Sequence, residues 1–99
     1  MESSFSDEDH RRVNVIVSGR VQGVFFRVST LEKAQQLGLV GTVKNLPDDT
    51  VEILAQGQPE AIEELLRWAH HGPPSAEVRS LAIRDETAGT EHKTFQVLR

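Results

Sequence analysis

The chain has 99 residues, of which 37% are hydrophobic and 26% are charged, and this is the length and composition of a single globular domain that buries its own core. It contains no cysteine, which excludes disulfides, thiolate nucleophiles and thiolate metal sites, and its formal net charge of -4 at pH 7 argues against a nonspecific nucleic-acid surface. No apolar run approaches the roughly 18 residues of a membrane span, and we expect a cytoplasmic protein without a membrane or nucleic-acid partner.

Residues 1–10 read MESSFSDEDH, a segment rich in Ser, Asp and Glu with a single aromatic residue, Phe5. A segment of this composition buries too little apolar surface to fold, so we expect a flexible acidic tail. Its acidic residues and His10 offer metal-ligating side chains, but a solvated tail is the favoured interpretation. The remaining residues, 11–99, are expected to form one domain.

A first strand is expected from Arg12, because valines at alternate positions give it one strongly apolar face. The glycine-containing stretch GRVQGVFFR follows at residues 19–27. A helix is expected to begin near Val24 or Phe25 and to end at Gly38. Its apolar stripe is formed by residues spaced four, four and three apart, namely Phe26, Thr30, Ala34 and Leu37.

Two strands are expected over residues 39–45 and 50–56, joined by the turn sequence NLPDDT. The clearest helical pattern lies in the next segment, GQPEAIEELLRWAHHG. Pro59 fits the first position of this helix, and Gly72 fits the residue after its end. Its apolar face is expected to bury Ile62, Leu65, Leu66 and Ala69, with Trp68 at the edge of the core.

Two more strands are expected over residues 76–84 and 94–98, after two prolines end the second helix. The order is then strand, helix, strand, strand, helix, strand, with one short added strand. This order matches the split βαβ unit, in which both helices cover one face of a mostly antiparallel sheet. We therefore predict an α+β, ferredoxin-like βαββαβ sandwich with a short extra C-terminal strand.

The stretch GRVQG has two interpretations. The structural one is a tight connection between strand and helix, and the functional one is a binding loop. It matches neither the Walker pattern nor the GxGxxG fingerprint. A short loop whose N–H groups turn inward at a helix N-terminus is suited to holding an anion. Arg27 lies one turn into the helix, where its planar guanidinium can bind two phosphate oxygens. The alternative for Arg27 is a solvated surface arginine.

Asn45 ends the second expected strand and also has two interpretations. As a turn residue, it would hydrogen-bond its own backbone before Leu46 and Pro47. In the predicted topology, however, the end of this strand and the start of the first helix lie near the same edge of the sheet. An amide with one acceptor and two donors can then orient a water molecule beside a phosphate.

The blocks GRVQGVFFR and LGLVGTVKN, followed by VEILAQG and GPPSAEV, closely resemble the acylphosphatases. The resemblance covers residues 11–99, and it implies a ferredoxin-like fold and a metal-free hydrolase that cleaves the carboxyl–phosphate bond of acyl phosphates. By this resemblance Arg27 binds the phosphate and Asn45 positions the attacking water. Thr42 stands where family members often carry an aromatic residue, which affects the packing of the second strand more than the chemistry.

An acyl phosphate carries a good leaving group, so positioning and charge stabilisation suffice for its hydrolysis. Phosphoryl transfer spreads charge over the nonbridging oxygens. The expected donors to these oxygens are Arg27 and the backbone amides of Gln22, Gly23, Val24, Phe25 and Phe26. Asn45 would hold water in line with phosphorus. The expected products are a carboxylate and inorganic phosphate, which should also inhibit, and no phosphoenzyme, cofactor or metal is needed. We expect a monomer.

Two other functions remain open on the sequence alone. RNA-recognition domains share this fold, and GVFF faintly resembles their aromatic motif, although that motif belongs on a central strand. A noncatalytic module that binds acyl phosphate is the second alternative, but we expect no fused partner domain, which favours a freestanding enzyme. His70 and His71 are expected to stabilise a helix C-terminus, and the turn pair Asp48 and Asp49 lacks a third metal ligand.

Overall fold

The structure is a computed structural model that describes residues 10–98. The predicted acidic tail lies outside the described residues, apart from His10. The chain forms seven elements in sequence order: β1 (Arg11–Arg20), α1 (Phe26–Gln36), β2 (Val40–Asn45), β3 (Val51–Gly57), α2 (Pro59–Ala69), β4 (Glu77–Glu86) and β5 (Phe95–Val97). Neither of these two helices is long and apolar enough to cross a membrane.

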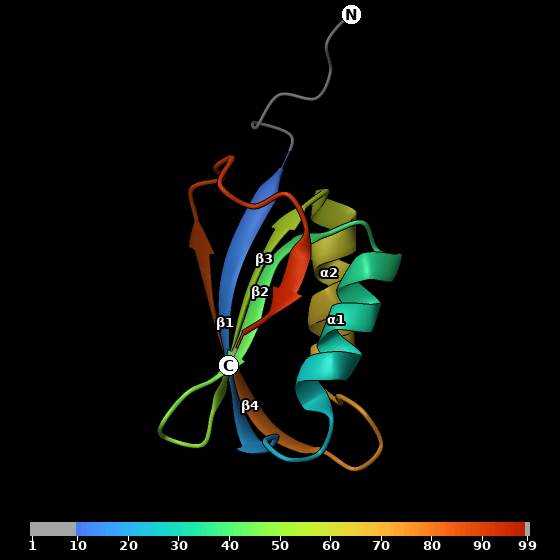
Figure 1. Cartoon of the computed structure of the whole chain (residues 1–99), viewed down its shortest axis with the longest axis vertical. Helices are drawn as coiled ribbons and strands as arrows, with labels where there is room; N and C mark the ends of the chain where they lie inside the picture. The colour runs from blue at the N-terminus through green and yellow to red at the C-terminus, as the bar shows by residue number, and fades with distance from the viewer. Residues whose placement is uncertain (1–9, 99) are drawn as a thin grey trace, which may run out of the picture.

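The strands form one five-stranded sheet in the order β4-β1-β3-β2-β5. β1 is antiparallel to β3 and β4, β2 is antiparallel to β3, and β5 runs parallel to β2. Figure 1 shows both helices packed on the same face of this sheet. The predicted ferredoxin-like α+β sandwich, with its short extra C-terminal strand, is confirmed.

Most element boundaries differ from those predicted by one or two residues, and three of these differences are instructive. α1 begins at Phe26, after the expected Val24 or Phe25, because Phe25 adopts a left-handed backbone conformation that a helix cannot continue. β4 extends to Glu86, because β1 offers it backbone partners as far as Arg12 even where the apolar alternation has stopped. β5 spans only Phe95–Val97, shorter than the expected five residues, and pairs with β2 over that length.

The core lies between the sheet and the two helices. The predicted faces are confirmed, because Val13, Val15 and Val17 of β1 and all four expected residues of α2 are buried. Phe26 is 1% exposed, and its ring centroid lies 5.6 Å from that of Trp68 at the edge of the core. A side chain at Gly72 would meet the ring of Phe26, so only glycine fits there. These contacts anchor the first residue of α1 and therefore the loop before it.

Candidate active site

The connection between β1 and α1 contains two residues with left-handed backbone conformations. Gly23 has φ 72°, and Phe25 has φ 63° and ψ 21°. Glycine adopts this conformation readily, whereas a residue with a Cβ does so at a cost of about 1–2 kcal/mol. Alternation of right- and left-handed residues turns successive N–H groups towards one point and forms a concavity that attracts anions.

The N-terminus of α1 has none of the features that usually satisfy it. Phe25 occupies the N-cap position without a side-chain hydrogen bond, and the first turn contains no acidic residue. The first N–H groups of a helix have no acceptor within the helix, and the helix dipole makes this end positive. Arg27 in the first turn adds a further positive charge. The arrangement therefore favours an anion at this end of α1.

The side chain of Gln22 ties this loop to the turn between β2 and β3. Its Nε2 donates hydrogen bonds to the backbone oxygens of Leu46, at 2.9 Å, and Thr50, at 2.8 Å. The turn is itself braced by Asp48, whose Oδ1 accepts hydrogen bonds from the hydroxyl of Thr50 at 2.6 Å and from its N–H at 3.2 Å. The loop before α1 is thereby held in place relative to Asn45, which ends β2.

The hydroxyl and N–H of Thr50 lower the pKa of Asp48 below its ordinary value, the hydroxyl being the larger cause. The carboxylate of Asp48 therefore serves to stabilise the turn. Within residues 10–98 no group of three His, Asp or Glu side chains gathers as metal ligands do.

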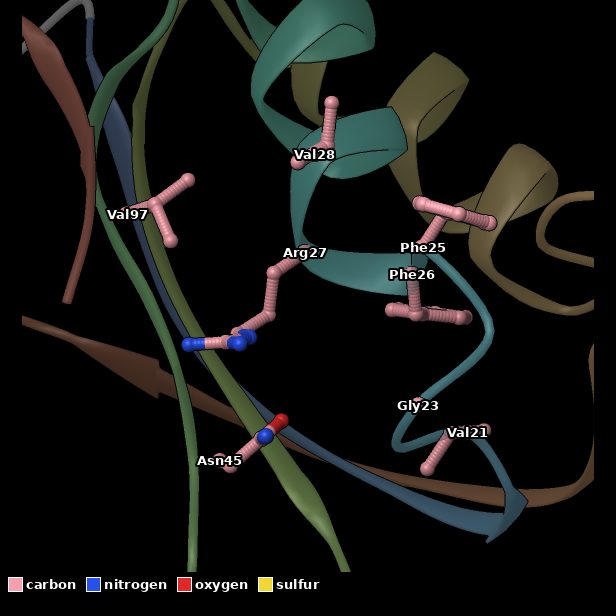
Figure 2. Close-up of a pocket in the computed structure, with 8 residues that line it drawn as sticks. All are labelled: Val21, Gly23, Phe25, Phe26, Arg27, Val28, Asn45 and Val97. Carbon is pink, nitrogen blue, oxygen red and sulfur yellow. The ribbon is translucent and has the colours of Figure 1, made fainter. Parts of the chain in front are cut away.

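A cavity of about 270 Å³ opens between the start of α1 and the ends of β2 and β5. Figure 2 shows the side chains of Arg27 and Asn45 projecting into it from α1 and β2. The residues that line it are Val21, Gly23, Phe25, Phe26, Arg27, Val28, Asn45 and Val97. Both residues singled out for catalysis therefore lie in one pocket, together with three of the five loop residues expected to bind phosphate. Gln22 and Val24 are not among the residues that line it.

The side chain of Arg27 is held by the end of the last strand. It is half-buried, and its Nη1 donates a hydrogen bond of 3.0 Å to the backbone oxygen of Leu98. A guanidinium has five N–H donors, so this bond leaves others to face the pocket. The role of Leu98 has no signal in the sequence, because any residue supplies a backbone carbonyl.

Asn45 presents an acceptor without a partner. Its Oδ1 is buried and accepts no hydrogen bond from the described residues, and a buried polar atom in this state costs about 1–3 kcal/mol. Within residues 10–98 no hydrogen bond joins the side chain of Asn45 to the turn, which is closed by Leu46 and Thr50 and braced by Asp48. An acceptor kept open inside a pocket is suited to a water molecule or a ligand.

The aromatic residues of GVFF do not resemble an RNA platform. Phe26 is buried under α2, and Phe25 precedes α1 and is not on a strand. The stacking aromatics of an RNA-recognition domain lie instead on central strands of the sheet. The resemblance that raised this alternative is therefore one of sequence letters alone. His70 and His71 are exposed at the end of α2, as expected for residues near a helix C-terminus.

Comparison with known proteins gives one consistent result. The family model for acylphosphatase matches residues 13–97. The chain is 51% identical over 87 residues to an acylphosphatase of Rubrobacter xylanophilus, covering 88% of this chain and 79% of that one. It is 48% identical over 89 residues to one of Methylococcus capsulatus, covering 90% and 97%.

Solved structures agree with this result. An acylphosphatase from Coxiella burnetii superposes with a TM-score of 0.89 at 36% identity, covering 97% of this chain and all of that one. One from Bacillus subtilis gives a TM-score of 0.86 at 32% identity, covering 90% and 99%. The chain therefore belongs to the acylphosphatase family, and the fold and activity of that family are its own.

Proposed function

We propose that the pocket between α1 and β2 is the site at which this acylphosphatase cleaves the carboxyl–phosphate bond of acyl phosphates. One observation carries the proposal. One cavity, at a helix N-terminus without a capping side chain, is lined by the guanidinium of Arg27 and by the Oδ1 of Asn45, an acceptor that has no partner among residues 10–98. The phosphoryl group and the attacking water each find a group suited to them there.

The phosphate is held by Arg27 and by the backbone N–H groups of residues 22–26. Phosphoryl transfer places charge on three nonbridging oxygens, and preorganised donors at these oxygens commonly contribute more to catalysis than any other single effect. The bound phosphate also explains why an arginine stands at the positive end of α1, because the anion reverses the local repulsion. The left-handed conformations of Gly23 and Phe25 support this role, because alternation of right- and left-handed residues turns successive N–H groups towards an anion.

Water is positioned by Asn45. Its open Oδ1 accepts a hydrogen bond from the water molecule, whose oxygen then attacks phosphorus opposite the leaving carboxylate. The carboxylate leaves without a proton from the protein, and the proton released by the water passes to a phosphate oxygen. Because the water is already held in line with phosphorus, part of the entropic cost of reaching the transition state is removed from the activation barrier.

The side chains that line the pocket include one cation and no carboxylate or imidazole. The proposed chemistry accordingly needs neither a protein base nor a metal ion, and inorganic phosphate should bind as product and as competitive inhibitor. We also propose that the enzyme is a monomer, that residues 11–99 form one domain and that the enzyme is cytoplasmic, in keeping with a chain that contains no cysteine.

The test is a steady-state assay with benzoyl phosphate, with and without a chelator. Multiple turnovers, with release of inorganic phosphate and benzoate in equal amounts, are expected under both conditions. Binding of the substrate without turnover would support the noncatalytic alternative. Loss of activity in the chelator, restored by a divalent metal, would contradict the proposed mechanism.

A further inference from the structure

We propose that the apolar wall of the same pocket, formed by Phe25, Val28 and Val97, binds the acyl group, and that the enzyme prefers acyl phosphates with apolar, uncharged acyl groups. This inference rests on the proposed function, because it assumes that phosphate occupies the polar end of the pocket. It adds the part of the substrate that Arg27 and Asn45 do not address.

The chemistry of the pocket lining is divided between two ends. Five of its eight residues carry apolar side chains, one is glycine, and the polar side chains are those of Arg27 and Asn45. A pocket with a few placed polar groups and an otherwise apolar lining suits a ligand with one charged end and one apolar end. An acyl phosphate with an apolar acyl group has this character.

The exposed apolar residues of the molecule are concentrated around this pocket. Four large hydrophobic side chains within residues 10–98 are strongly exposed: Phe25 at 78%, Val28 at 49%, Ile83 at 43% and Leu98 at 37%. Phe25 and Val28 line the pocket, and Leu98 holds Arg27 through its carbonyl. Apolar surface gathered beside a functional site indicates a surface that a ligand covers.

The side chain of Phe25 does not belong to the hydrophobic core. Its ring is mostly in solvent, and its backbone has the left-handed conformation that glycine or asparagine adopts more easily. Strained residues of this kind concentrate at ligand sites, where the surrounding structure holds them in place. Contact with the acyl group gives the exposed ring a function.

The three residues of the wall lie where they can contact the acyl group of a substrate whose phosphate is bound at Arg27. Phe25 directly precedes α1, Val28 lies in its first turn, and both line the pocket. Val97 lies on β5, across the opening from α1 and beside the guanidinium of Arg27 (Figure 2). An acyl group attached to a phosphate at Arg27 therefore lies between apolar side chains.

Charged acyl groups find no partner in this wall. Apart from Arg27, which is assigned to the phosphate, no Lys, His, Asp or Glu lines the pocket. A charged acyl group would lose part of its hydration without compensation. We therefore expect aspartyl phosphate to be a poor substrate relative to hexanoyl phosphate.

The test compares hexanoyl phosphate with acetyl phosphate. Their leaving groups are aliphatic carboxylates of similar basicity, so the ratio of their kcat/KM values reports contact with the chain and not intrinsic reactivity. A methylene that is fully removed from water favours binding by about fourfold. For four added methylenes on a partly open wall, we expect a ratio of about tenfold in the wild type.

The variants separate the wall from the rest of the surface. Val28→Thr keeps the shape of the side chain, and Phe25→Asn introduces a residue that tolerates the left-handed backbone conformation. Each should lower the hexanoyl-to-acetyl ratio by about twofold to threefold, and the double variant should bring it close to one. The control is Ile83→Thr, which changes an exposed apolar residue on β4 that does not line the pocket and should leave the ratio unchanged. Melting curves show that each variant is folded.

Three results would decide the inference. A wild-type ratio near one, or a ratio that persists in the double variant, would overturn it and leave the proposed function intact. If Phe25→Asn loses activity with both substrates because it disturbs the phosphate loop, the ratio for Val28→Thr decides alone. If the wild type hydrolyses neither acyl phosphate, the proposed function fails as well.

Discussion

The guanidinium of Arg27 donates a hydrogen bond to the backbone oxygen of Leu98, at 3.0 Å, and so joins the first turn of α1 to the residue after β5. β5 is itself fixed to the sheet by its parallel pairing with β2, the strand that ends at Asn45. The orientation of the Arg27 guanidinium and the position of Asn45 therefore depend on the same pair of strands. Substitutions at these positions give the most informative tests.

Arg27→Ala should weaken phosphate binding and also lower turnover, because the same contacts serve the ground state and the transition state. Removal of a charged group that stabilises the transferring phosphoryl group commonly costs on the order of 10³ or more in rate. The measurements are kcat/KM with benzoyl phosphate and the inhibition constant for inorganic phosphate. Arg20→Ala is the matched control, because Arg20 is exposed and does not line the pocket. Equal effects of the two substitutions would contradict the assignment of Arg27.

Gln22→Ala should destabilise the protein and slow the reaction together. The substitution removes two hydrogen bonds between the phosphate loop and the β2–β3 turn, and each contributes about 1 kcal/mol to the free energy of unfolding. The backbone N–H of residue 22 remains, so any loss of kcat reflects the lost alignment of the loop with Asn45. We expect kcat to fall roughly tenfold, since small displacements of reacting groups have large effects on the rate. Gln36→Ala, at an exposed position of α1, should change neither quantity.

Thr50→Val should raise the pKa of Asp48 towards its ordinary value, because the hydroxyl of Thr50 is the main cause of its depression. A carboxyl with a lowered pKa in the folded state stabilises the fold above its ordinary pKa and loses that contribution as the pH falls through the lowered value. The difference in melting temperature between the wild type and Thr50→Val should therefore shrink on acidification. Titration of Asp48 by NMR measures the pKa directly, and an unchanged value in the variant would contradict this account of the turn.

Inorganic phosphate should compete with the substrate and should protect the protein against unfolding, because it binds the folded loop and not the unfolded chain. At a phosphate concentration one hundred times its dissociation constant, the expected stabilisation is about 2.7 kcal/mol. Arg27→Ala should abolish the shift in melting temperature, whereas Arg20→Ala should keep it. A shift that survives Arg27→Ala would place the anion elsewhere on the molecule.

The sequence predicted the parts of this molecule that depend on local pattern. The valines of β1 and the apolar face of α2 identified the elements that form the core, and the fold followed from the order of the elements. Glycine at positions 19 and 23, followed by Arg27, indicated an anion-binding loop through residue type and spacing. Asn45 was placed near that loop by topology alone.

The features that the sequence did not reveal depend on contacts between distant residues. Gln22 reaches backbone oxygens 24 and 28 positions away, and Arg27 reaches one 71 positions away. Backbone acceptors carry no residue identity, so no pattern could indicate them. The left-handed conformation of Phe25 was also missed, because an aromatic residue is not expected in that conformation.

Asn45→Ala separates the positioning of water from the binding of phosphate. The substitution removes an acceptor that is buried without a partner among the described residues, so the melting temperature should stay the same or rise. The affinity for inorganic phosphate should also change little, because Asn45 is assigned to the water and not to the phosphate. Only turnover should suffer.

The turnover number of Asn45→Ala with benzoyl phosphate is the most direct test that the pocket shared by Arg27 and Asn45 is the active site. A folded variant with unchanged phosphate inhibition should lose roughly 10² to 10³ in kcat, the usual effect of removing one preorganised polar group. A kcat near that of the wild type would contradict the assignment, and Asn45 would then be a strand-end residue with no part in the reaction.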